Sequence, residues 1–176
     1  DFLEAHPNHS LCFHAHSSLR SDGTKRECFR YKEDVEDCPM GDMILGGGGF
    51  MATASMVYVK ELKDNLPEWA RKAPIGDAPT MLVLAERGKV GYIHEVMSCY
   101  RVAAPGSWTV RISRDRKKRK QLHKEMIQWI KGFDMWTNKA YHPYVRKALF
   151  KLKMHYYLKT IPFVPRIIDF LKIRGL

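Results

Sequence analysis

APIGDAPTMLVLAERGKVGYIHEVMSCYRV, residues 73–102, carries the clearest secondary-structure signals of the chain. Asp77 precedes Ala78 and Pro79, an arrangement expected of a helix N-cap followed by an early proline. Gly88 is placed to end the helix, and the residues after it alternate with a period of two, as in a strand. The buried stripe of the helix is predicted to comprise Met81, Leu82, Leu84 and Ala85. Helix, glycine turn and strand together predict a fold of the α/β class.

The segments upstream are predicted from the same signals. Alternation over Ser10–Leu19 predicts a strand that ends at the turn 21–23, and residues 1–5 are read as the last helical turn before a proline. Residues 25–42 are polar and mixed in sign, which predicts a loop with a short helical piece. Residues 55–60 are expected to be extended, although an apolar run this short is also compatible with a helix.

Four consecutive glycines occur in MILGGGGFMATASMVYV, residues 43–59. A phosphate-binding P-loop requires a lysine and a hydroxyl residue after its last glycine, whereas Phe50, Met51 and Ala52 follow here. A dinucleotide fingerprint requires an acidic residue at the end of a second strand, but Asp64 and Glu68 lie in a polar stretch that contains proline. The glycines are therefore expected to form a loop in which the backbone passes close to a neighbouring group or takes a positive φ.

Length and composition are those of a folded protein that could form one domain: 176 residues, 45% apolar and 28% charged. No run of about 18 apolar residues predicts a membrane span. Asp1 without an initiator Met, and without a secretory signal after it, predicts that the chain begins inside a longer protein. Four cysteines without metal spacing favour reduced thiols in the cytosol.

Charge divides the chain in two. Residues 1–110 hold 12 Lys and Arg against 15 Asp and Glu, a net charge of −3, whereas residues 111–176 hold 18 against 4, a net charge of +14. The second part is predicted to be helical, with Pro143, Pro162 and Pro165 dividing it. Basic helices that also carry Leu, Phe, Ile and Tyr are typical of peripheral binding to anionic lipid. Two alternatives to lipid binding remain for the run RDRKKRK, residues 114–120. It is either a solvated helix face or a nucleic-acid-binding patch, and the second is less favoured because the run lacks aromatic residues.

The glycine-bearing segment GGGFMATASMVYVK and the helix–strand unit IGDAPTMLVLAERGKVGYIHEVMSCYRV together resemble the acceptor-side half of a family-two inverting glycosyltransferase of the GT-A fold. The opening DFLEAHPNHSLCFH resembles the segment that follows the metal-binding Asp-x-Asp of that family. The resemblance covers about residues 1–109. It implies a partial GT-A, Rossmann-like domain over residues 1–110, followed by a basic amphipathic helical tail over residues 111–176.

The resemblance implies sugar transfer from a nucleotide-sugar donor to a hydroxyl of a glycan or lipid-linked glycan. Asp77 would be the catalytic base, because inverting transfer needs a carboxylate that takes the proton of the attacking hydroxyl; a plain helix cap is the alternative. Arg101 would neutralise the leaving diphosphate, with a plain surface arginine as the alternative. Trp69 and Trp108 would stack on sugar faces, with ordinary core or rim aromatics as the alternative. The expected substrate-binding residues are Gly48, Gly49, Phe50, Thr53, Ser55, Trp69, Gly76, Tyr100, Arg101 and Trp108.

A divalent Mg or Mn ion is expected to be bound by an upstream Asp-x-Asp, a motif that this chain lacks. Ala103 stands where the family often has a histidine able to complete a metal site. The acidic run at residues 33–37 is read as a solvated loop. Cys12, His14 and His16 lie in the predicted strand without a second ligand pair, so ordinary sheet residues are favoured over a zinc site.

We therefore expect a cytoplasmic enzyme of polysaccharide synthesis, peripheral at the inner face of the membrane, of which this part alone is inactive. The alternative is a non-catalytic basic adaptor that binds membrane or nucleic acid through its C-terminal helices.

Overall fold

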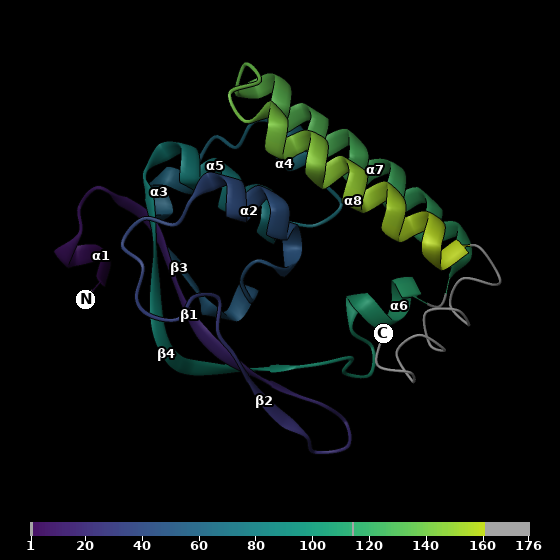
Figure 1. Cartoon of the computed structure of the whole chain (residues 1–176), viewed down its shortest axis with the longest axis horizontal. Coiled ribbons are helices and arrows are strands. Elements are labelled where there is room, and N and C mark those ends of the chain that lie inside the picture. Colours follow the sequence, from purple (N-terminus) through teal and green to yellow (C-terminus); the bar gives the residue numbers. More distant parts are fainter. Residues whose placement is uncertain (1, 114, 161–176) are drawn as a thin grey trace.

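The chain forms a mixed α/β structure with one four-stranded sheet, seen in a computed structural model that describes residues 2–113 and 115–160 (Figure 1). Helix α5 (Asp77–Arg87) packs on the sheet, and α2 (Met40–Gly46) and α3 (Lys60–Lys63) pack on α5. The long helices α7 (Arg116–Trp136) and α8 (His142–Thr160) form an antiparallel pair at one edge of the molecule. None of the helices in the described ranges is long and apolar enough to cross a membrane. The α/β class predicted from the sequence is confirmed.

The sheet is built around the central strand β1 (His9–Leu19). Strand β4 (Lys89–Arg101) runs parallel to it along one edge, whereas β2 (Lys25–Cys28) and β3 (Met56–Tyr58) pair antiparallel with its two halves on the other edge. Both strands that the sequence predicts from alternation are present. The extended segment predicted at residues 55–60 is confirmed over Met56–Tyr58, which form β3. Ser55 belongs to a 3₁₀ turn instead, and Lys60 begins α3.

Strand β2 corrects the prediction of a loop over residues 25–42. Its side chains are exposed or half-buried, so no apolar alternation marks it in the sequence. Pairing with the end of β1 across a tight turn makes it a strand, although its own side chains carry no strand pattern. The short helical piece predicted in the same segment is confirmed as the start of α2 (Met40–Gly46).

Helix α5 (Asp77–Arg87) lies between the sheet and the helices that cover it, and it ends at Gly88 as predicted. The buried part of α5 is wider than the predicted stripe, because Val83 is also fully buried. Within the stripe, only Ala85 is partly exposed. The hydroxyl of Ser10 donates a 2.6 Å hydrogen bond to the carbonyl of Leu84 and ties α5 to β1. Gly88 is needed for close approach, because a Cβ there would lie 3.0 Å from Ser10.

Helices α7 (Arg116–Trp136) and α8 (His142–Thr160) pack on the α/β part. Short helices complete the structure: α1 (Phe2–Ala5), α3 (Lys60–Lys63), α4 (Glu68–Arg71), α6 (Trp108–Ser113) and the 3₁₀ turns η1 (Gly47–Gly49) and η2 (Thr53–Ser55). One hydrophobic cluster includes Phe133 of α7 and Val145 of α8 together with Met43 of α2. The boundary predicted at residue 110 stays a prediction, but residues on both sides of it build this cluster.

Of the prolines predicted to divide the basic region, Pro143 lies in the first turn of α8, where its missing N–H costs no helical hydrogen bond. It follows the turn between α7 and α8, as expected of a dividing proline. Pro162 and Pro165 lie outside the described residues.

Candidate functional site

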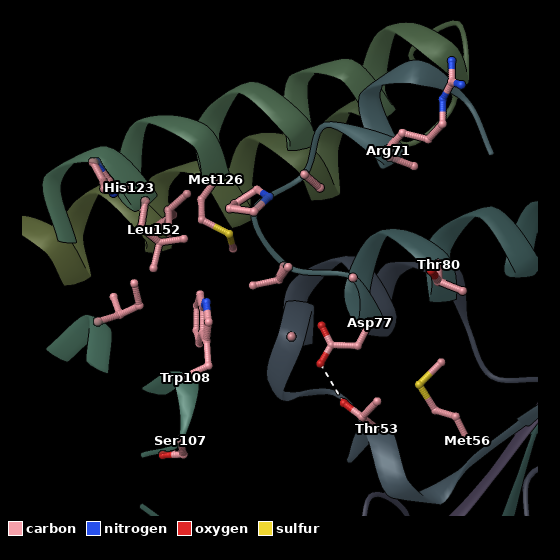
Figure 2. Close-up of a pocket in the computed structure, with 18 of the residues that line it drawn as sticks. Thr53, Met56, Arg71, Asp77, Thr80, Ser107, Trp108, His123, Met126 and Leu152 are labelled. Atoms are coloured by element: carbon pink, nitrogen blue, oxygen red, sulfur yellow. Dashed lines mark hydrogen bonds between the residues drawn. The ribbon is translucent and has the colours of Figure 1, made fainter. Parts of the chain in front are cut away.

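A pocket of about 1150 Å³ lies between the start of α5, strand β3 and the helices α6–α8 (Figure 2). Asp77 and Thr53 contribute to one wall, and Met126 and Leu152 contribute to the wall formed by α7 and α8. Trp108 of α6 projects between these walls in Figure 2. The wall with the Asp77 carboxylate is therefore made by the α/β part, and the opposite wall is made by the basic helices.

Asp77 lies in the first turn of α5 and is half-buried. Its Oδ2 accepts a 2.9 Å hydrogen bond from the Thr53 hydroxyl, and its Oδ1 accepts a 2.8 Å bond from the backbone N–H of Ala78 (Figure 2). Its position near the helix N-terminus, where the dipole favours negative charge, suits a carboxylate. Two bonds hold that carboxylate at the pocket wall.

The prediction that Asp77 is the N-cap of this helix is wrong. Gly76 occupies the N-cap position, with φ −94° and ψ −31°, and Asp77 is the first helical residue. The chain enters helical geometry one residue earlier than the proline spacing suggested. No side chain caps the helix, so the Asp77 carboxylate is engaged locally by the N–H of Ala78 rather than by the N–H groups further into the first turn.

Six of the residues predicted for catalysis or substrate binding line this pocket together: Gly48, Thr53, Gly76, Asp77, Tyr100 and Trp108. Tyr100 comes from β4 and Trp108 from α6, and their side chains are 45% and 42% exposed. Aromatic faces that are open to solvent in a pocket are suited to stack on the apolar C–H face of a sugar. Residues from five separate segments thus converge on one cavity.

The four glycines differ in their surroundings. Gly48 lines the pocket, and a Cβ added there would lie 3.3 Å from Cδ1 of Ile75, another lining residue. Gly47 has φ +52°, a left-handed conformation that favours glycine. The carbonyl of Gly49 accepts a 2.6 Å hydrogen bond from Arg30, and a Cβ at Gly49 would meet open space. Of the two glycines predicted to bind substrate, Gly48 is at the pocket and Gly49 is not among its lining residues.

Four other predicted substrate-binding residues do not line the pocket. Phe50 is a core residue, 2% exposed, whose ring packs against Phe13. The buried hydroxyl of Ser55 donates to the carbonyl of Ala52 at 2.7 Å. Arg101 is exposed at the end of β4. Phe50 and Ser55 are held in the packed interior, and Arg101 lies at the end of a strand. None of the three is among the residues that line the pocket.

Trp69 is the fourth of these residues, and its ring lies in the contact between α4 and α7. It stacks on Trp129 with a centroid separation of 6.2 Å and meets Phe133 edge-on at 5.6 Å. The ring of Trp69 therefore takes part in helix packing, and Trp69 is not among the residues that line the pocket.

Sequence reasoning missed the side chains that α7 and α8 add to the pocket. Arg119, Leu122, His123 and Met126 come from α7, and Leu152, His155 and Tyr156 come from α8. The spacing of Leu122, Met126, Trp129 and Phe133 marks one helix face and was the available signal. Two further cations, Lys63 and Arg71, line the pocket. Arg101, the residue predicted to meet the leaving group, is not among the lining residues.

His123 stacks on Tyr156 at a centroid distance of 4.1 Å, which joins α7 to α8 at the pocket wall. Partial burial, and secondarily the positive charge of Lys153, lower its pKa. Its imidazole is therefore biased toward the neutral form, which reduces its value as a cation for binding an anionic substrate.

Within residues 2–113 and 115–160, no group of three or more His, Cys, Asp or Glu side chains is arranged to hold a metal ion. Nδ1 of His14 lies 2.8 Å from the carbonyl of Ala15. The pKa of His16 is lowered by burial and then by the nearby His14 and Arg30, and burial raises the pKa of Cys12. These side chains act as sheet residues in the described structure.

Comparison with protein-family models, with curated proteins and with solved structures gives no match to this chain.

Proposed function

We propose that this chain is the acceptor-side part of an inverting glycosyltransferase with a partial GT-A domain, and that Asp77 is its catalytic base. The observation that carries the proposal is the position of the Asp77 carboxylate: it is held by Thr53 at the wall of a large pocket, with the aromatic rings of Tyr100 and Trp108 on the same cavity. A helix cap alone would not require the pocket or the aromatic rings.

The proposed reaction needs little more from these residues than positioning and proton transfer. The acceptor hydroxyl attacks the anomeric carbon of the donor sugar, the bond from that carbon to the nucleoside diphosphate breaks, and the hydroxyl proton passes to Asp77. Thr53 orients the carboxylate by donating to Oδ2. The positive charges of Lys63, Arg71 and Arg119 at the pocket favour an anionic leaving group or acceptor.

The donor-binding half and the divalent Mg or Mn ion belong, in this proposal, to residues outside the chain. Such an ion would stabilise the charge that develops on the leaving diphosphate. The acceptor is a glycan or a lipid-linked glycan, and the reaction is part of cell-surface polysaccharide synthesis at the cytoplasmic side of a membrane. The described residues alone are expected to bind nucleotide sugars weakly, because they are only the acceptor side.

The test is Asp77→Asn in a longer protein that contains this chain and the donor half. Asn preserves size and polarity but cannot accept the proton, so we expect kcat to fall by about 10²–10⁴-fold, with a small change in KM for the donor. Asp64→Asn is the matched control at an exposed carboxylate outside the pocket. Normal turnover of Asp77→Asn, with an unchanged melting temperature, would refute the role of Asp77.

A second test uses the chain itself. Calorimetric titration with uridine and guanosine diphosphate sugars should show weak binding or none. Tight binding would place a donor site within this chain and contradict the proposal that the chain is the acceptor side alone.

A further inference from the structure

Helix α8 has two apolar faces, one of which is buried in the fold while the other is exposed. Val145 and Ala148 are buried in the hydrophobic cluster, and Leu152 and Tyr156 line the pocket. Phe150, Met154 and Tyr157 lie on the opposite side of the helix, with exposed fractions of 66%, 40% and 57%. We call these three residues the outer stripe.

The outer stripe is continuous because of its spacing. Phe150, Met154 and Tyr157 follow one another at intervals of four and three residues, so their side chains lie one above the other along a single helix face. The residues that face the core and the pocket occur at intervening positions. Figure 1 shows the α7–α8 pair at the periphery of the molecule. The exposed fractions of Phe150, Met154 and Tyr157 place the outer stripe on the solvent side of α8.

Positive charges border the outer stripe on both sides. At 100° per residue, Lys147 and Lys151 fall on one side of it, and Arg146 and Lys153 fall on the other. All four of these residues, the basic flanks, are exposed. Helix α8 contains no Asp or Glu, so no acidic side chain within the helix neutralises the flanks.

From this arrangement we infer that the outer face of α8 docks on an anionic lipid surface. The basic flanks pair with lipid phosphates, and the outer stripe enters the boundary between headgroups and acyl chains, as in interfacial amphipathic helices. Charge complementarity selects an anionic partner. The exposed apolar side chains between the cations favour lipid over nucleic acid, because a row of phosphates offers no apolar layer to receive them.

The structure changes what is expected of the basic tail. From the sequence alone, the Leu, Phe, Ile and Tyr residues of the basic helices are treated alike, but the face of α8 that carries Val145, Ala148 and Leu149 is committed to the protein core. Docking therefore depends on seven residues of the outer face, and it does not require α8 to leave the core.

The experiment is sedimentation of the full chain with vesicles of phosphatidylcholine, with and without phosphatidylglycerol. We expect binding only to the anionic vesicles. Binding should weaken when the salt concentration rises from about 0.1 M to about 1 M, because the Debye length falls from about 10 Å to about 3 Å. Equal sedimentation with both kinds of vesicle would overturn the inference.

Two variants separate the flanks from the stripe. Arg146→Gln/Lys147→Gln/Lys151→Gln should weaken anionic-vesicle binding by about tenfold or more. The control Lys25→Gln/Arg26→Gln/Lys32→Gln removes the same charge at exposed sites of β2 and the following loop, and should change binding less than about twofold. An equal loss in both triple variants would mean that net charge alone drives binding, which overturns docking by α8.

Phe150→Ser/Met154→Ser/Tyr157→Ser should also weaken binding by about tenfold, because apolar insertion is lost. Its control is Val57→Ser/Met97→Ser/Val102→Ser, at exposed apolar positions of the sheet and its end. Unchanged vesicle binding by the stripe variant would overturn the inference. So would tighter binding to duplex DNA than to anionic vesicles, or a wild-type dimer, seen by size exclusion, that the stripe variant abolishes.

Discussion

The hydroxyl of Thr53 donates a 2.9 Å hydrogen bond to Oδ2 of Asp77, across 24 positions of sequence. Thr53 belongs to the 3₁₀ turn η2, and Asp77 begins α5, so the bond joins the segment after the four glycines to the helix of the proposed base. It gives the carboxylate a defined orientation toward the pocket (Figure 2). The glycine segment thus bears on the site through Thr53 as well as through Gly48.

Thr53→Val in the longer enzyme tests this positioning. Val keeps the shape of Thr but has no hydroxyl, so we expect kcat to fall about tenfold, in the range of one lost hydrogen bond to a charged group, with little change in KM. Thr53→Ser, which restores a donor, should recover most of the activity. Steady-state kinetics of both variants are the measurement, and full activity of the Val variant would show that the bond has no role in turnover.

Gly132→Ala tests the packing of α7 on α4. A Cβ at Gly132 would lie 2.5 Å from Cβ of Trp69, so one of the two helices must shift. We expect a loss of about 1–3 kcal/mol in the free energy of unfolding, measured by denaturant titration. Gly49→Ala, where a Cβ meets open space, is the control and should be neutral or slightly stabilising. Equal stability of the two variants would contradict this packing.

Asp115 caps α7, and its effect should depend on pH. The backbone N–H of Lys118 donates to Oδ1 of Asp115 at 3.0 Å, and this bond lowers the pKa of the carboxyl below its usual value of 3.8. Because the folded-state pKa is the lower one, the ionised cap stabilises the protein above pH 3.8, and this stabilisation is lost as the pH falls through the folded-state pKa. The first turn of α7 holds no acidic residue, so no other carboxylate there offsets its basic side chains.

Asp115→Ala should therefore lower the melting temperature by about 2–4 °C at neutral pH, and the difference from wild type should shrink in acid below pH 3.8. Asp115→Asn retains an uncharged cap and should lie close to wild type at neutral pH. Thermal melts across this pH range are the measurement. A constant difference between wild type and Asp115→Ala at all pH values would refute the role of the ionised carboxylate.

The four cysteines test the fold without any activity assay. Cys99 is exposed and Cys28 is half-buried, whereas Cys12 and Cys38 are buried. Burial raises the pKa of Cys38 to about 12, so little reactive thiolate forms there at neutral pH. A thiol reagent with peptide mapping should modify Cys99 first and Cys28 next, and the other two only after denaturation. Rapid modification of Cys38 in the native protein would contradict the described core.

Local sequence signals were sufficient where a segment forms its structure with its neighbours in the chain. Alternation placed β1 and β4, and Gly88 marked the end of α5, because side-chain period and backbone conformation are local properties. Strand β2 escaped prediction because its polar side chains carry no pattern and only pairing with β1 makes it a strand. Of the candidate residues, Asp77, Thr53 and Trp108 do share one pocket. Phe50 and Trp69 pack against other aromatic rings instead, and residue type alone does not distinguish a packing aromatic from one that stacks on a ligand.

By itself the sequence determined the α/β class, the helix–turn–strand unit that begins at Asp77, and the division into an acidic part and a basic part. Only the tertiary structure decided that the basic helices close the pocket opposite Asp77, and that α8 uses one apolar face for the core and exposes another. The reason is physical: periodicity shows which residues share a face of a helix, but whether that face is buried depends on what the rest of the chain places against it.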